Sequence, residues 1–131
     1  MSFEYDIPCV ATTRSGAEVP ISLKIAKSFW DKAIGYMGAK SIGKSTGMVY
    51  ARGRSLHTLF MRVPIDVCWI GRFDPSDQSW PVVSLDASVA PWRILFAPRG
   101  AVGGIEVAPG TFNESDRPIS IRLSLIHISE P

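Results

Sequence analysis

The chain has 131 residues, a length that suits one domain. Hydrophobic residues make up 46% and charged residues 20%, which excludes a disordered chain, because such chains are poorer in apolar residues. The net charge of +2 is too small to favour a nucleic acid or an anionic membrane as partner. We therefore expect one globular domain with no nucleic-acid partner.

The sequence also bears on the compartment. It contains no apolar run of about 18 residues, so no membrane span is expected. The first residues, MSFEYDIPCV, carry Glu4 and Asp6 early and lack a basic segment followed by an apolar one, so we expect no secretory signal and a cytoplasmic protein. Cys9 and Cys68 form no CxxC pair, and we expect both thiols to be reduced and buried on strands.

The C-terminal end has an unusual sequence. Its last nine residues are LSLIHISEP. Translating the bases CTG TCT CTT ATA CAC ATC TCC GAG CCC, which occur in a transposase adapter used to prepare sequencing libraries, gives this string in full. We therefore expect residues 1–122 to form the single globular domain and residues 123–131 to be a non-native adapter translation, with the true C-terminus missing. His127 then carries no functional weight, and His57 is the one histidine left.

The N-terminal half predicts a hairpin followed by a helix. Residues 3–11 and 18–26 are expected to be its two strands, because apolar and polar residues alternate in the second and Ser15-Gly16 marks a turn between them. A short helix is predicted at 28–37, where apolar residues recur at helical spacing before Gly38. A polar loop at 38–46 and a strand at 47–51 follow.

The C-terminal half is richer in strands. The densest apolar block lies at 57–70 and is divided by Pro64. A strand at 79–89 is expected to pair back across an exposed turn at 71–79. With about eight short strands and one helix, the predicted class is α+β, mainly β, as a compact antiparallel domain that is either barrel-like or a sandwich. The remaining strands are predicted at 92–96, 103–108 and 118–122.

Asp66 is a polar residue inside the apolar block. If 65–70 is a strand, Asp66 faces the same side as Cys68 and Ile70. An ionised carboxylate there needs a partner or several backbone N–H groups. One interpretation is structural: Asp66 holds loop N–H groups or pairs with Arg62. The other is a perturbed carboxylate in a cleft that serves as acid, base or ligand.

His57 opens the same block and allows an enzymatic interpretation. A catalytic histidine needs an orienting acid and a nucleophile, for which Asp66 and either Cys68 or Ser55 are available. However, no G-x-S-x-G elbow supports such an arrangement. A metal site needs about three protein ligands, and the spacing of His57, Asp66 and Cys68 matches no metal template. We therefore predict no metal and no cofactor.

Other candidates lie further along the chain. Trp92 offers a large apolar plane with one N–H donor, and Arg93 beside it could hold an anion. Glu106 lies between two apolar residues of a predicted strand and should face away from them. The glycines of RGAVGGIE lack the Lys-Ser/Thr pair of a phosphate-binding loop, so they are interpreted as a turn or bulge.

Several segments resemble one family. The stretch HTLFMRVPIDVCWI at 57–70 is similar to the central signature of the domain of unknown function 192 (DUF192) family, which reads roughly His-Thr-hydrophobic-Phe-Met-Arg/Lys-hydrophobic-Pro-hydrophobic-Asp-hydrophobic. FWDKAIGYMG, GMVYA, APWRI and GGIEVAPGTF resemble the family's helix, Gly-Met strand, Pro-Trp-Arg segment and late Glu-containing strand with its Pro-Gly turn. The resemblance covers roughly residues 20–112. The Gly-Asp segment that usually follows is absent or divergent here.

The resemblance implies a small β-rich domain with one helix, and it implies no reaction or cofactor. It contributes most of the candidate binding residues, to which Arg93 is added because it lies beside Trp92. The complete set is His57, Phe60, Met61, Pro64, Asp66, Trp92, Arg93 and Glu106.

We therefore expect a non-catalytic binding or accessory module that uses the His57–Asp66 region. Its partner, a small ligand or a protein, is expected where the 57–66 motif meets residues 92–99. The alternative is a small hydrolase-like enzyme that uses His57 and Asp66, whose side chains must then converge on an open pocket with a nucleophile or a metal. A binding module instead presents an exposed apolar groove or patch.

Overall fold

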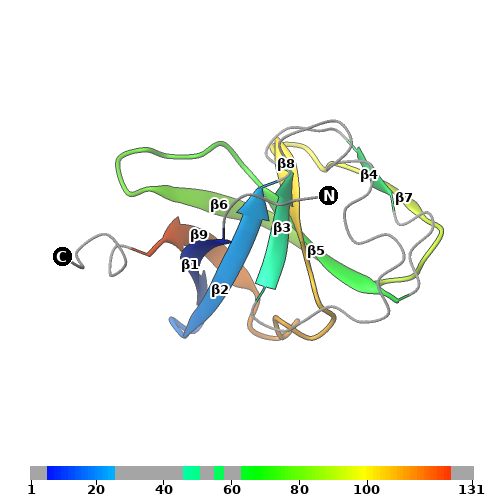
Figure 1. Ribbon diagram of the computed structural model, residues 1–131, viewed down its shortest axis with the longest axis horizontal. Coiled ribbons are helices and arrows are strands. Elements are labelled where there is room, and N and C mark those ends of the chain that lie inside the picture. The colour runs from blue at the N-terminus through cyan, green and yellow to red at the C-terminus, as the bar shows by residue number, and fades with distance from the viewer. Residues whose placement is uncertain (1–5, 26–45, 51–54, 58–62, 125–131) are drawn as a thin grey trace.

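A computed structural model describes residues 6–25, 46–50, 55–57 and 63–124 and shows a mainly β domain (Figure 1). Its strands are β1 (Asp6–Thr13), β2 (Glu18–Ile25), β3 (Thr46–Tyr50), β4 (Ser55–His57), β5 (Ile65–Ile70), β6 (Ser79–Val89), β7 (Ile94–Phe96), β8 (Gly103–Val107) and β9 (Pro118–Leu123). Seven of them close into a barrel in the order β1-β2-β3-β8-β5-β6-β9, and β4 pairs with β7 in a separate sheet.

The barrel confirms the mainly β class and selects the barrel over the sandwich. One detail of the prediction is wrong: β2 and β3 pair in parallel, whereas the other pairs of described strands are antiparallel. Parallel neighbours need a connection of a dozen residues or more, and residues 26–45 supply that length. The helix predicted at 28–37 lies outside the described residues, and the part of the chain that is described contains no helix.

Strand β5 separates two apolar layers, and all six of its residues are buried. Cys68 and Ile70 pack inside the barrel with residues of the other strands, whereas Val67 and Trp69 belong to a second cluster that contacts Leu95 of β7. The predicted alternation along 65–70 is therefore confirmed. Because β4 and β7 lie over the outer face of β5, nothing along this strand reaches solvent, and its sequence is apolar almost throughout.

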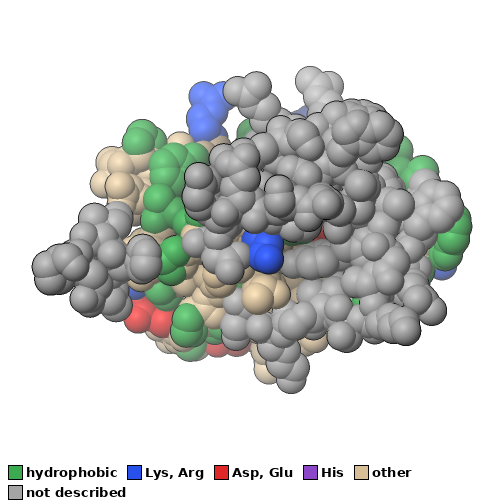
Figure 2. Space-filling model, in the orientation of Figure 1, with side chains coloured by type: hydrophobic (Ala, Val, Ile, Leu, Met, Phe, Trp, Pro, Cys, Tyr) green, Lys and Arg blue, Asp and Glu red, His purple; other side chains and the backbone are tan. Residues whose placement is uncertain are grey.

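The small β4–β7 sheet is at one end of the molecule. In Figure 1 it is at the right-hand side, and Figure 2 shows hydrophobic side chains on the surface of that end. Leu95 faces inward onto β5, so the alternate residues of β7 face outward.

Strand β9 closes the barrel between β1 and β6. Its last residue, Leu123, pairs with Cys9, and the Leu123 side chain packs against the barrel core. The N–H of Leu123 donates to the carbonyl of Gln78 at 2.9 Å, and the N–H of Ser124 donates to the carbonyl of Pro8 at 2.9 Å. Leu123 and Ser124 thus complete the barrel. This does not require them to be native residues, because any non-proline residue can supply such backbone bonds.

The effect of shortening the C-terminus on stability should depend on whether Leu123 and Ser124 are retained. A chain ending at Ser124 should keep its free energy of unfolding within about 0.5 kcal/mol of the full chain. A chain ending at Arg122 loses two backbone hydrogen bonds and the packing of Leu123, which should cost about 1–3 kcal/mol. Urea denaturation of the three chains measures both values. A large loss for the chain ending at Ser124 would contradict the adapter interpretation.

Candidate functional site

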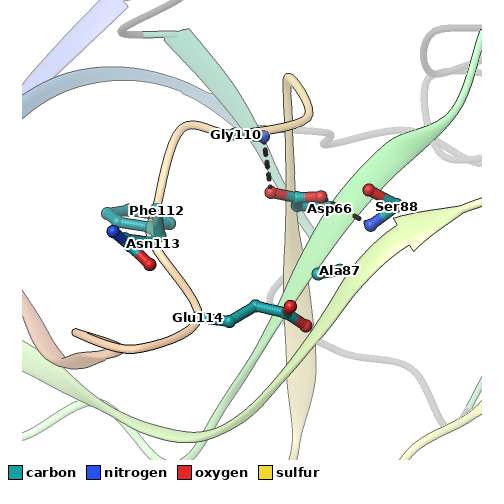
Figure 3. Close-up of a pocket in the computed structure, with 7 residues that line it drawn as sticks. All are labelled: Asp66, Ala87, Ser88, Gly110, Phe112, Asn113 and Glu114. Carbon is teal, nitrogen blue, oxygen red and sulfur yellow. Dashed lines mark hydrogen bonds between the residues drawn. The ribbon is translucent and has the colours of Figure 1, made fainter.

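The carboxylate of Asp66 lies inside one end of the barrel and is only 1% exposed. Its Oδ1 accepts a hydrogen bond from the Ser88 N–H at 2.7 Å, and its Oδ2 accepts one from the Gly110 N–H at 3.0 Å (Figure 3). These bonds match the structural interpretation, in which Asp66 holds loop N–H groups. Arg62, the other partner considered, lies outside the described residues.

A β-bulge supplies the first of these donors. The register between β5 and β6 shifts at this point, so that Ala87 and Ser88 of β6 both oppose the single residue Asp66. Ser88 has φ of 52°, in the left-handed region that few non-glycine residues adopt. A bulge of this kind turns a backbone group away from the ladder. The Ser88 N–H is thereby directed at the Asp66 side chain instead of a neighbouring strand.

A tight turn after β8 supplies the second donor. In Ala108-Pro109-Gly110-Thr111, the Thr111 N–H donates to the Ala108 carbonyl at 3.1 Å. Gly110 has φ of 79°, and proline followed by a left-handed glycine is the pattern of a type II turn. The turn presents the Gly110 N–H to Asp66. The Asp66 carboxylate therefore bonds to both the β6 bulge and the loop between β8 and β9.

An open cavity of about 350 Å³ lies beside the Asp66 carboxylate. It is formed between the β6 bulge and the loop that follows β8, and Figure 3 shows the side chains around it. Among the described residues that line it, two carry carboxylates and none is a lysine, an arginine or a histidine. The lining residues are Asp66, Ala87, Ser88, Gly110, Phe112, Asn113 and Glu114.

The sequence-predicted candidates do not all meet at this cavity. His57 pairs with Ile94 in the β4–β7 sheet, which covers the outer face of β5, whereas the Asp66 carboxylate lies on the inner face. The main chain of His57 is therefore separated from the Asp66 carboxylate by β5. Trp92 is two residues before Ile94, so the segment that carries it adjoins the strand of His57.

Glu106 faces the outer side as well. It pairs with Val67 across β5 and β8, and Val67 belongs to the outer cluster, while Ile105 and Val107 lie in the barrel core. The buried carboxylates of Asp66 and Glu106 thus lie on opposite faces of one sheet. Of the other candidates, Pro64 and Arg93 are exposed, and Phe60 and Met61 lie outside the described residues.

Two residues that sequence inspection missed stand out on the β4–β7 sheet. Ile94 is 58% exposed and Phe96 is 76% exposed, and Trp92 just before them is 56% exposed. Ile94 and Phe96 alternate with the inward-facing Leu95, so they share the outer face of β7. We call these three residues the β7 apolar face. The apolar residues of this segment are visible in the run WRILF at 92–96. Because all three strand residues are apolar, however, the sequence pattern does not indicate which of them are buried.

The cysteines are too well shielded to act as thiolates. Burial raises the pKa of the Cys68 thiol from 9.0 to about 12, and the charge of Asp66 contributes to this increase. Burial likewise raises the pKa of Cys9 to about 11. Because the thiolate is the nucleophilic form, neither cysteine is suited to attack a substrate near neutral pH. This removes Cys68 as the nucleophile of the enzymatic alternative.

Thiol reactivity tests this protection. At pH 8 we expect iodoacetamide to modify the native protein at least about tenfold more slowly than the protein unfolded in urea, as followed by mass spectrometry. The unfolded thiols ionise near pH 9 and the folded ones near pH 11 and pH 12. Their contribution to stability is therefore complete below pH 9 and is lost as the pH rises from 9 through 11 for Cys9 and through 12 for Cys68. Equal modification rates would contradict the described burial.

The two hydrogen bonds of Asp66 predict its effect on stability. Asp66→Ala should lower the free energy of unfolding by about 1–3 kcal/mol, because it leaves the Ser88 and Gly110 N–H groups without their acceptor. Glu114→Ala, which removes an exposed carboxylate with no hydrogen bond or ion pair to the described residues, is the control and should change stability by less than about 0.5 kcal/mol. Urea denaturation checks both values, and unchanged stability of Asp66→Ala would show that these bonds do not hold the barrel end.

The described parts of the chain bear on two questions, whether there is a metal site and whether there is a membrane-spanning helix. Residues 6–25, 46–50, 55–57 and 63–124 contain no group of three or more His, Cys, Asp or Glu side chains placed to hold a metal ion. The same residues form no helix long and apolar enough to cross a membrane.

A closed β-barrel with a buried Asp in its central motif defines the class of the protein. The chain belongs to the DUF192 family, described as an uncharacterized ACR, whose family model matches residues 10–122. No curated protein matches the sequence at a significant level.

Two solved structures share this fold. One is a protein of unknown function from Novosphingobium aromaticivorans DSM 12444, with a TM-score of 0.70 and 18% identity, in a match covering 88% of this chain and 84% of that one. The other, from Sinorhizobium meliloti 1021, is described as "a putative transcription regulator", with a TM-score of 0.72 and 16% identity over 92% of this chain and 97% of that one. At these identities the likeness is one of fold alone.

Proposed function

We propose that the protein is a non-catalytic binding module whose partner docks on the β7 apolar face. The observation that carries this proposal is the exposure of Trp92, Ile94 and Phe96 within one short segment. Single exposed hydrophobic residues are ordinary on a protein surface, whereas a group of large ones marks an interaction site. Aromatic side chains in such a group are the usual anchors of an interface.

The backbone of Trp92 supports the proposal. Its φ of 66° lies in the left-handed region, which is a true outlier for a bulky residue. Strained conformations of this kind persist only where the surrounding structure holds them, and they gather at functional sites. The strain therefore presents a tryptophan to solvent at a cost in stability, which is consistent with selection for binding.

The chemistry around the β7 apolar face indicates the kind of partner. Arg93 and Arg99 are exposed in the same segment, and no acidic residue occurs from residue 87 to residue 105. Within the described strands, β7 pairs with β4 alone, and we propose that an added strand pairs with its other edge. The partner that fits is an extended protein segment with apolar side chains and acidic residues.

The alternative, a hydrolase-like enzyme, is less well supported. Both oxygens of Asp66 accept backbone hydrogen bonds, and β5 separates this carboxylate from the main chain of His57. Both observations favour the binding module. The net charge of +2 likewise does not favour a nucleic acid, so the proposal names a protein partner.

Synthetic peptides test the proposed function. A short peptide of alternating Leu and Glu should bind the full-length protein and move its tryptophan fluorescence to shorter wavelength as Trp92 is covered. The same peptide with Lys in place of Glu should bind at least about tenfold more weakly, because like charges meet at Arg93 and Arg99. Phe96→Ser should weaken binding of the Leu-Glu peptide by about tenfold or more.

A matched variant serves as the control. Ile119 of β9 is half-exposed and apolar but lies outside the β7 apolar face, so Ile119→Ser should leave peptide affinity unchanged. Both variants should retain the stability of the parent, since the altered side chains are exposed. The proposal is wrong if Phe96→Ser binds the peptide as the parent does, or if the Lys peptide binds as tightly as the Glu peptide.

A further inference from the structure

We propose that an open cleft between β6 and β9 binds a small aliphatic carboxylate. The charged end of this ligand bonds to Arg14 and Arg117, and its carbon chain packs on Val83 and Ile119. The cleft shares no residue with the β7 apolar face, so the inference is independent of the proposed protein partner. We call it the β6–β9 cleft, and its volume is about 170 Å³. Its lining residues are Arg14, Val82, Val83, Ser84, Leu85, Arg117, Pro118 and Ile119.

The cleft lies where β6 and β9 part from each other. Their pairing covers residues 79–81 of β6, although this strand continues to Val89. Pro118, at the start of β9, has no N–H to donate to a neighbouring strand. The carbonyl of Leu85 instead accepts a hydrogen bond from Nη2 of Arg117 at 2.9 Å. The barrel wall is therefore open beside residues 82–85, and a side chain rather than a strand spans the opening.

Two β-bulges place apolar side chains at this opening. In the β5–β6 ladder Val83 is the extra residue, since residues 82 and 84 pair with consecutive residues of β5. In the β1–β9 ladder Ile119 is the extra residue, since its two neighbours pair with consecutive residues of β1. Bulges of this kind redirect a side chain or end strand pairing, and they are frequent beside functional sites. Val83 is 40% exposed and Ile119 is 50% exposed, so both offer apolar surface to a ligand in the cleft.

Two arginines give the cleft its charge. The Arg14 N–H donates to the Arg117 carbonyl at 2.9 Å, so these residues are adjacent on two neighbouring segments, and both are exposed. No acidic residue is among the described residues that line the cleft. A guanidinium has five N–H donors, and the bond from Arg117 to Leu85 uses one of them. A carboxylate offers two acceptor oxygens and forms strong, charge-assisted hydrogen bonds with such donors.

Asp116 is an acidic side chain of the protein that interacts with Arg14. The hydrogen bonds from Ser15 and Thr13 hold the pKa of Asp116 below its ordinary value, and the charge of Arg14 contributes to this decrease. These bonds are 2.6 Å from the Ser15 hydroxyl and 2.8 Å each from the Ser15 N–H and the Thr13 hydroxyl. Asp116 does not line the cleft, and no ion pair within 4.0 Å joins it to Arg14. Asp116 therefore offsets part of the positive charge, and Arg117 keeps the site attractive to an anion.

The size and walls of the cleft favour a short carbon chain. A cavity of about 150 Å³ holds a molecule of the size of benzene, so a cleft of about 170 Å³ suits a ligand of about six carbon atoms. An inorganic anion would leave the apolar surface of Val83 and Ile119 unused. An added peptide strand would compete for the Leu85 carbonyl, which Arg117 already occupies. These points favour an aliphatic carboxylate over both.

Titration with sodium hexanoate tests the inference. In the 15N-labelled full chain at neutral pH and constant ionic strength, hexanoate should shift the amide resonances of Ser84 and Ile119 to saturation. Acetate carries the charge without the chain, and n-hexanol carries the chain without the charge. Each of these two molecules should bind at least about fivefold more weakly than hexanoate, because each makes only one of the two kinds of contact.

A pair of variants tests the charged contact. Arg14→Gln removes one guanidinium and should weaken the binding of hexanoate about fivefold. Arg14 is exposed, so this variant should fold as the parent does. Arg72→Gln makes the same change in net charge at an exposed position in the loop between β5 and β6, outside the lining of the cleft, and should leave the affinity unchanged.

A second pair tests the apolar contact. Val83→Ser should weaken the binding of hexanoate about threefold or more, because it removes apolar surface that the carbon chain covers, and should leave the binding of acetate unchanged. Val102 is 39% exposed, close to the 40% of Val83, and lies outside the lining of the cleft. Val102→Ser should therefore bind hexanoate as the parent does.

Four results would overturn the inference. They are no saturable shift with hexanoate, binding of acetate or n-hexanol as tight as that of hexanoate, an equal loss of affinity in Arg14→Gln and Arg72→Gln, or an equal loss in Val83→Ser and Val102→Ser. None of these measurements uses the Leu-Glu peptide or a residue of the β7 apolar face. Ile119→Ser, which should leave peptide affinity unchanged, should weaken hexanoate binding, so failure of one proposal is distinguishable from failure of the other.

Discussion

Two hydrogen bonds from backbone amides to one buried carboxylate hold one end of this barrel together. Asp66 is fixed by its strand, and the Ser88 and Gly110 amides reach it from two segments that are not paired with each other there. Each donor requires a left-handed backbone, which a bulge provides at Ser88 and a Pro-Gly turn provides at Gly110. The cavity lies between these two segments, beside the carboxylate to which both of them are bonded.

The central motif does not form one site, because β5 sends alternate residues to opposite faces. Its inner face joins Asp66 to the barrel core, and its outer face packs under the β4–β7 sheet. Residues adjacent in the sequence therefore serve different surfaces, and Asp66 is separated from Val67 and Glu106 by the thickness of the sheet. One continuous sequence motif thus serves two structural purposes. Its inward residues, such as Asp66, belong to the barrel interior, and its outward residues, such as Val67, pack under the β4–β7 sheet.

Sequence patterns predicted the parts of this structure that depend on local geometry. The alternation along 65–70 follows from the residues themselves, whereas the Pro-Gly turn that contains Gly110 was expected from the family resemblance. The choice of barrel over sandwich and the parallel β2–β3 pair depend on contacts between distant segments, which a period-two pattern does not encode. The bulge opposite Asp66 was equally hidden, because Ala87 and Ser88 carry no glycine signal. The outward orientation of Ile94 and Phe96 required knowing that Leu95 packs on β5.

The connection from β6 to β7 relates the cavity to the β7 apolar face. Ser88, at one end, donates its N–H to Asp66, and Trp92, four residues later, is exposed with the second left-handed backbone of this segment. Between them, Val89 packs against the outer cluster of β5. The chain thus passes from the inner side of β5 to the outer side within a few residues, and its two unfavourable backbone conformations lie at either end of this passage. The bond between Ser88 and Asp66 fixes where the passage begins, and the exposed Trp92 lies at its other end.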